Sequence, residues 1–178
     1  MCLSNVTTTE PLIAEEDITV YKYIEKASIL VNNWKELVNH GDECIAVIGN
    51  DTVNGKISID SSGELFISAE DMGYNSWVFD KMVTSIIIKG KEIVEQGYRT
   101  RYQYTKVVIG EEYTSELICN YIDVYIGLHS YINKPELSIY YNIVECIIPK
   151  GSKYFIGNFK GIKDSIASDK LKYVKIIN

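Results

Sequence analysis

A series of short segments rich in β-branched and aromatic residues, separated by turn-forming residues, limits the fold of this chain most. Residues 18–24, Ile-Thr-Val-Tyr-Lys-Tyr-Ile, alternate in the way typical of a half-buried strand. Three similar runs between residues 42 and 68 are divided by Asn50-Asp51, Asn54-Gly55 and Ser61-Ser-Gly. Asn-Gly favours a tight hairpin turn because both residues accept a positive φ. The pattern therefore predicts a three-stranded antiparallel meander over residues 42–68.

The second half of the chain is again mostly strand-like. The candidate strands are residues 85–89, 104–109, 121–132, 139–148 and 172–177. Helical spacing of apolar residues between Glu25 and Asn39 predicts a short amphipathic helix, and shorter helical pieces are expected near 91–96 and 134–141. The first 16 residues are expected to be an irregular lead-in.

These elements predict an α+β fold that is strand-rich. The expected architecture is an antiparallel meander plus a mixed sheet with a few short helices. A chain of 178 residues suits one domain over 1–178, in which residues 42–68 can form a small β-meander lobe. The main sheet is expected from 18–24 and 85–178.

Composition and charge limit the function classes. The net charge of −6 makes nucleic acid an unlikely partner, because neutralising phosphates supplies most nonspecific affinity for it. No apolar run approaches the roughly 20 residues that span a bilayer, and no secretory signal is visible at the N-terminus. We therefore expect a cytoplasmic protein without a membrane segment.

The cysteines and histidines do not form a metal-binding pattern. The four cysteines lack a CxxC spacing and only two histidines are present, so we expect buried thiols and no metal site.

The strongest polar candidate is His129, which interrupts the apolar segment 121–132 together with Ser130 and Tyr131. A general base needs a partner that fixes its tautomer, and no such partner follows from the sequence. Two interpretations stay open, a satisfied and partly buried histidine or a binding or catalytic residue.

A second candidate is the segment from Tyr98 to Tyr104, which interleaves Arg99 and Arg101 with tyrosines that include Tyr102. Guanidinium and phenol groups can stack on a base or hold a phosphate. The alternative is an ordinary strand edge with exposed arginine and tyrosine side chains.

The C-terminal part resembles a family of uncharacterised small proteins encoded by phages and prophages. The resemblance covers residues 97–178 and the first strand, and rests on Gly127-Leu-His-Ser-Tyr, Cys146-Ile-Ile-Pro-Lys-Gly-Ser-Lys-Tyr and Ile166-Ala-Ser-Asp-Lys-Leu. It implies a phage-encoded accessory protein that binds a host protein or a small ligand in the host cytosol, with counter-defence as one specific role.

The order of elements is similar, more distantly, to the mono-ADP-ribosyltransferase fold. Those enzymes place an arginine on a first strand, a Ser-Thr-Ser strand by the nicotinamide pocket, and a catalytic Glu-x-Glu turn. Here the matching positions are Tyr21-Lys-Tyr, His129-Ser-Tyr and Ser168-Asp-Lys, and the Glu-x-Glu motif is missing. The resemblance implies a cleft lined by Lys22, Arg99, His129 and Ser130.

A binding protein without catalytic residues is the favoured function. Its expected binding residues are Lys22, Arg99, Arg101, Tyr102, His129, Ser130 and Tyr131. The alternative is an ADP-ribosyltransferase-like enzyme or a protein that binds an NAD-like nucleotide. The sequence leaves the oligomeric state open.

Overall fold

The computed structural model describes residues 3–69, 74–77, 83–101, 105–120, 122–159 and 162–177, with the backbone alone at 74–77. The chain divides into two compact units. Unit 1 comprises residues 1–25 and 100–178, and unit 2 comprises residues 26–99. Whether the chain folds as one domain stays a prediction.

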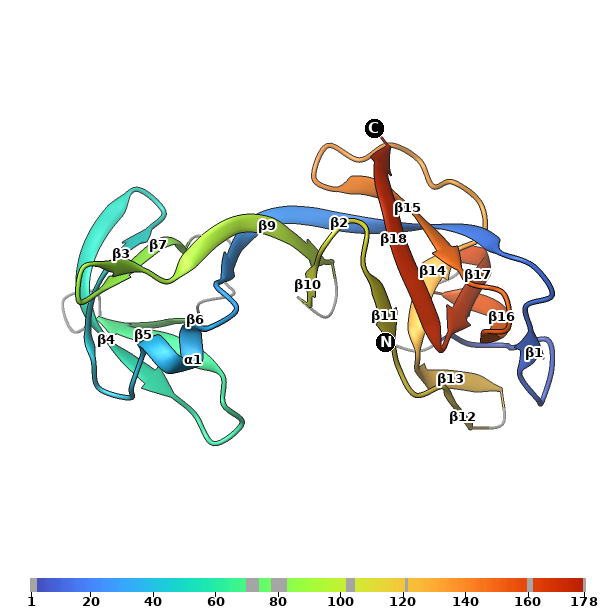
Figure 1. The fold of residues 1–178 in the computed structure, drawn as a ribbon, viewed down its shortest axis with the longest axis horizontal. Helices are drawn as coiled ribbons and strands as arrows, with labels where there is room; N and C mark the ends of the chain where they lie inside the picture. The colour runs from blue at the N-terminus through green and yellow to red at the C-terminus, as the bar shows by residue number, and fades with distance from the viewer. Residues whose placement is uncertain are drawn as a thin grey trace. The chain divides into compact units, whose positions relative to one another are not determined.

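Unit 1 is built from antiparallel strands (Figure 1). They are β1 (Leu12–Ile13), β2 (Ile18–Leu30), β10 (Lys106–Val107), β11 (Glu112–Thr114), β12 (Ile118–Asn120), β13 (Asp123–Ile126), β14 (Leu128–Tyr131), β15 (Asn142–Ile148), β16 (Lys153–Phe159), β17 (Ile162–Ser168) and β18 (Lys170–Ile177). The main sheet has the order β1-β16-β17-β14-β2-β15-β18-β11, and β12 pairs with β13. Strand β2 continues beyond Glu25 into unit 2.

Both faces of the β2 region are packed. Strand β2 pairs with β15 from Ile18 opposite Ile148 to Ile24 opposite Asn142. Since directly paired residues share a face, Val20 and Ile24 lie on the same buried face as Val144, Cys146 and Ile148. A separate buried cluster contains Leu3, Val124, Tyr131, Phe155, Phe159 and Ala167.

The beginning of the described chain belongs to the fold of unit 1. Leu3 is fully buried and exchanges two backbone hydrogen bonds of 2.8 Å with Val124. Ser4 and Asn158 exchange another pair of 2.7 Å, and the Thr7 amide donates to the carbonyl of Ile156 at 3.0 Å. Residues 3–11 are irregular, as expected, with isolated bridges at Leu3 and Ser4. Their attachment to β13 and to the edge of β16 beyond β1 was not expected, because sequence periodicity does not reveal it.

Unit 2 contains a second antiparallel sheet with the order β6-β5-β4-β3-β7-β8. Its elements are α1 (Trp34–Leu37), β3 (Glu43–Ile48), β4 (Asp51–Ile59), β5 (Leu65–Ala69), β6 (Tyr74–Trp77), β7 (Val83–Ile88), β8 (Lys91–Glu92) and β9 (Val94–Thr100), whose last residue belongs to unit 1. Aliphatic side chains from β3, β4, β5 and β7 form its core, against which Trp34 and Leu37 pack. The predicted meander over 42–68 is confirmed as β3, β4 and β5.

The first hairpin of the meander turns at Gly49 and Asn50, with φ of 63° at Gly49. The predicted turn at Asn54-Gly55 was wrong, because both residues lie inside β4. A Cβ at Gly55 would come within 2.8 Å of Ile67 Cγ2 and 2.9 Å of the Ser68 carbonyl oxygen. The glycine therefore serves the close approach of β4 and β5.

The expected α+β class was wrong, because the described residues are almost entirely strand and the only helix among them is α1. The ladders along the unit 1 order from β1 to β11 and those of the unit 2 sheet are antiparallel, so the predicted mixed sheet was also wrong. In place of the helix expected between Glu25 and Asn39, β2 runs to Leu30 and only four residues are helical. Ile29 and Leu30 are buried as strand residues, so the helical spacing came from two adjoining elements.

The shorter helices were wrong as well. Residues 91–96 form β8 and the start of β9, and 134–141 contain no helix. In the part of the chain that the structure describes, no helix has the length and apolarity to cross a membrane.

Candidate functional site

The predicted binding residues are distributed over both units. Lys22, Arg101, His129, Ser130 and Tyr131 belong to unit 1, and Arg99 belongs to unit 2. Tyr102 lies outside the described residues. The structure brings Lys22 and His129 together, because β2 and β14 are neighbours that pair at Tyr21 and Tyr131.

The histidine ring is held by carbonyl groups. His129 Nδ1 lies 3.0 Å from the Gly127 carbonyl oxygen, and Nε2 lies 3.3 Å from that of Val124. The side chain is 6% exposed, and burial, assisted by the charge of Lys22, lowers its pKa to about 4. The imidazole is therefore neutral at pH 7 and has one N–H, which donates to one of these two carbonyl oxygens.

Lys22 is the polar residue between Val20 and Ile24, whose buried side chains lie on the same face of β2. Its ammonium donates a 2.8 Å hydrogen bond to the carbonyl oxygen of His129. Burial lowers the pKa of Lys22 from 10.5 to about 8, against a smaller opposite effect of Cys146. Among the described residues no carboxylate lies within ion-pair distance of this ammonium. Lys22 thus brings a charge into the sheet without a protein counter-ion.

We expect Lys22→Met to raise the free energy of unfolding at pH 7 by about 2 kcal/mol, because the variant removes the cost of burying an ammonium. The folded-state pKa of Lys22 is lowered, so the unfolded chain binds the extra proton between about pH 8 and 10.5. Wild type should therefore gain stability relative to the variant as the pH rises through that window.

Chemical denaturation at a series of pH values measures this difference. Lys175→Met is the matched control, since Lys175 is exposed and pairs with Glu145 at 3.5 Å, and its effect should stay within about 0.5 kcal/mol. If the Lys22→Met protein is less stable than wild type at pH 7, burying the Lys22 ammonium does not destabilise the fold and the prediction is wrong.

The remaining predicted residues of unit 1 differ in their surroundings. The Ser130 hydroxyl is buried and has no hydrogen-bond partner in the described part of the chain. Tyr131 packs edge-on against Tyr23 with 5.8 Å between ring centroids. The Arg101 guanidinium lies 4.4 Å from the ring centroid of Tyr141 and 5.9 Å from that of Tyr23. The Arg101 guanidinium therefore lies over tyrosine rings of unit 1, and the stacking on a base or the phosphate contact expected for it stays a prediction.

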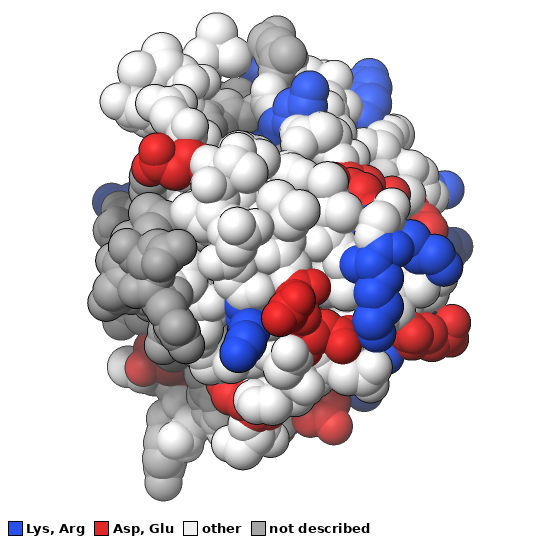
Figure 2. Space-filling model, turned by 90° about the vertical axis from the view of Figure 1, so that its left-hand side faces the viewer, with Lys and Arg blue, Asp and Glu red and all other residues white. Residues whose placement is uncertain are grey.

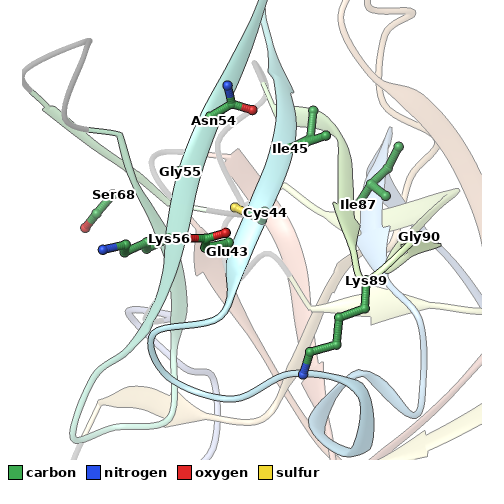
Figure 3. A pocket seen from close by; sticks show the side chains of 10 residues that line it. All are labelled: Glu43, Cys44, Ile45, Asn54, Gly55, Lys56, Ser68, Ile87, Lys89 and Gly90. Atoms are coloured by element: carbon green, nitrogen blue, oxygen red, sulfur yellow. The ribbon is translucent and has the colours of Figure 1, made fainter.

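A groove of about 550 Å³ lies on the sheet of unit 2 (Figure 3). It is lined by Glu43, Cys44, Ile45, Asn54, Gly55, Lys56, Ser68, Ile87, Lys89 and Gly90. Ile45 and Ile87 are directly paired across β3 and β7, and they are 48% and 37% exposed. The groove therefore presents a pair of aliphatic side chains to solvent, within the volume range of ligand sites.

Charges of both signs border this groove. Glu43 is paired with Lys56 across β3 and β4, and Lys89 Nζ lies 3.2 Å from a carboxylate oxygen of Asp42. Figure 2 views the side on which Figure 1 draws β3, β4 and β7, and shows an uncharged area with basic and acidic side chains around it. This arrangement of apolar centre and charged rim is typical of protein–protein interfaces.

The rim also contains backbone strain. Lys89 has φ of 50° and Gly90 has φ of 78°, so the turn between β7 and β8 holds a lysine in the left-handed region. That conformation costs roughly 1–2 kcal/mol for a residue with a Cβ, and Asn or Gly fits such turns better.

None of the predicted binding residues lines this groove. The same holds for a second groove of about 700 Å³ in unit 1, lined by Leu12, Ile13, Glu15, Glu16, Ile18 and Tyr154. A signal for the unit 2 groove was present in the sequence, because residues 44–48 are apolar at every position and a strand of this kind has an apolar second face.

No family model, curated protein or solved structure matches this chain. Within the described residues, no group of three or more His, Cys, Asp and Glu side chains could hold a metal ion.

Proposed function

We propose that this chain is a non-enzymatic binding protein that contacts a partner protein through the unit 2 groove. The observation that carries the proposal is the exposed Ile45–Ile87 pair on an otherwise well-packed sheet. A phage-type accessory role with a host protein as partner, in the host cytosol, is the setting that the resemblance of the chain implies.

The aliphatic pair supplies the affinity in this proposal. Fully burying an aliphatic side chain contributes on the order of 1.5–3 kcal/mol relative to leaving it in water. Ile45 and Ile87 are 48% and 37% exposed, so covering each can contribute about half of that or less. Two adjacent isoleucines in a groove can therefore act as an anchor for an apolar side chain of the partner.

The rim favours a protein over a nucleotide as the occupant. Lys56 attracts an anion, but Glu43 is its direct cross-strand neighbour and Lys89 is already paired with Asp42. A nucleotide phosphate would meet repulsion from Glu43, whereas a protein surface can place a carboxylate at Lys56 and a cation at Glu43.

The Cys44 thiol, which packs in the core of unit 2 behind the groove, is neutral at neutral pH. Burial raises the pKa of Cys44 to about 11, so the sulfur is a neutral thiol and a weak nucleophile. This supports a binding surface over a covalent catalytic site.

The test begins with a photo-crosslinking amino acid at position 45 or 87 in the host cell. Position 162 is the matched control, since Ile162 is 47% exposed on β17 of unit 1. One protein should be captured from both groove positions and not from the control. Its affinity for the purified chain is then measured by calorimetry.

We expect Ile45→Asp to weaken that affinity by about tenfold or more, because a charge replaces a central apolar contact. Ile45→Thr, which keeps a β-branched residue, should give a smaller loss, and Ile162→Asp none. Unchanged affinity in folded Ile45→Asp would refute the proposal. Crosslinking to a second copy alone, or binding of NAD that Ile45→Asp abolishes, would replace it with self-association or nucleotide binding.

A further inference from the structure

Hydrogen-bond donors gather on the buried face of β2 in unit 1. The Lys22 ammonium has three N–H groups, of which one donates to the His129 carbonyl oxygen. Lys22 as a residue is only partly buried, but burial is the main cause of the lowered pKa of its ammonium, which therefore lies below the surface of unit 1. The two remaining N–H groups have no hydrogen-bond acceptor among the described residues, so a bound ligand could supply one.

Ser130 adds a donor beside them. Counting from the Tyr21–Tyr131 pair, the antiparallel register places Ser130 opposite Lys22, so both side chains point to the same face. The Ser130 hydroxyl is buried and unpartnered among the described residues. A buried hydroxyl without a partner costs on the order of 1–3 kcal/mol, which an incoming acceptor would recover.

We infer that Lys22 and Ser130 form a binding site for an oxyanion, the carboxylate or phosphate group of a small ligand. The ammonium supplies the charge and two hydrogen bonds, and the Ser130 hydroxyl supplies another. The His129 carbonyl oxygen fixes the ammonium through its 2.8 Å hydrogen bond. This site lies in unit 1 and is independent of the protein-binding groove of unit 2.

The groups that face Lys22 define how the site responds to pH. Cys146 on β15 and Tyr173 on β18, which is paired with Cys146, lie on the face of Lys22, and burial raises the pKa of both, that of Cys146 to about 12. The His129 ring on β14 points to the other face, and its pKa is lowered to about 4. Glu145 on β15 points to the opposite face and pairs with Lys175. Among these groups only Lys22 changes charge between pH 7 and 10, so the affinity for an oxyanion should fall about tenfold per pH unit above pH 8.

Acetate and inorganic phosphate are the probes, titrated against the full chain at constant ionic strength with chloride as the reference anion. The melting temperature of wild type should rise saturably at pH 7 with at least one probe, and the rise should vanish at pH 10. The probe with the tighter apparent constant identifies the carboxylate or the phosphate group as the preferred ligand chemistry.

Three variants test the assignment. Lys22→Met should abolish the response, Ser130→Ala should weaken the apparent affinity by about tenfold, and Lys175→Met should respond as wild type. Ser130→Ala keeps the ammonium, so it decides the matter if Lys22→Met does not fold. Equal responses in wild type and Lys22→Met, or no response to either probe, would overturn the inference. Ile45→Asp should leave the response intact, which separates this test from the test of the protein-binding groove.

Discussion

Gly157→Ala is expected to lower the free energy of unfolding by about 3 kcal/mol, because it forces the N-terminal segment of residues 3–7 away from β16. An added Cβ would lie 2.6 Å from the Ser4 carbonyl oxygen, 3.1 Å from Leu3 Cγ and 3.3 Å from Val6 Cα. Two of these neighbours are backbone atoms, which cannot move without loss of the Ser4–Asn158 hydrogen bonds and the burial of Leu3.

Thermal and chemical denaturation would measure the loss, and hydrogen exchange at the Ser4 and Asn158 amides would locate it. Gly97→Ala in unit 2 is the control, since the new methyl would meet the end of the flexible Ile29 side chain. Its cost should be smaller because that side chain can change rotamer. Equal losses in both variants, with Ser4 still protected, would show that segment 3–7 yields without separating from β16.

A second large effect is expected from pH. As the pH falls from 6.5 to 4, His129 should remove about 3 kcal/mol of stability. The folded-state pKa is lowered, so over this window the unfolded chain binds a proton that the folded protein does not bind. The contribution of the neutral imidazole is therefore complete above pH 6.5 and lost below about pH 4.

The comparison of wild type with His129→Asn isolates this effect, because the asparagine amide can donate to the Gly127 carbonyl group and does not titrate. The variant should be less stable at pH 7, and the difference should shrink as the pH falls to 4. His40→Asn keeps His129 and should follow wild type. A constant difference between wild type and His129→Asn from pH 7 to 4 would exclude His129 as the titrating group.

Local strand patterns were readable from the sequence, and their pairing was not. Residues 18–24 alternate as a strand and form the centre of the unit 1 sheet. The predicted strands stop at residue 148 and resume at residue 172, so the paired strands 153–159 and 162–168 were missed. Glycines at 151, 157 and 161 resemble turn signals in that stretch. The helix predicted between Glu25 and Asn39 was wrong because the spacing of apolar residues does not distinguish one helix from a strand followed by a single helical turn.

The same holds for the candidate sites: the sequence indicated single residues on strands but not which strands are neighbours. The alternating pattern correctly predicted that Lys22 and His129 lie on strands. A lysine and a histidine are unusual among the apolar residues of these strands, which is why they were candidates. Their contact depends on β2 and β14 being neighbours, which no local pattern contains. The Ile45–Ile87 pair requires the β3–β7 ladder, whose two strands are separated in the chain by β4, β5 and β6.

The insertion of unit 2 between Glu25 and Thr100 sets an order of events during synthesis on the ribosome. All strands of the unit 2 sheet emerge in one continuous stretch, so this unit can close before the rest of unit 1 exists. Strand β2 emerges early, yet His129 follows Lys22 by 107 positions. The first half of β2 must therefore wait as an unpaired, apolar strand on a nascent chain, where we expect it to be the segment that chaperones bind.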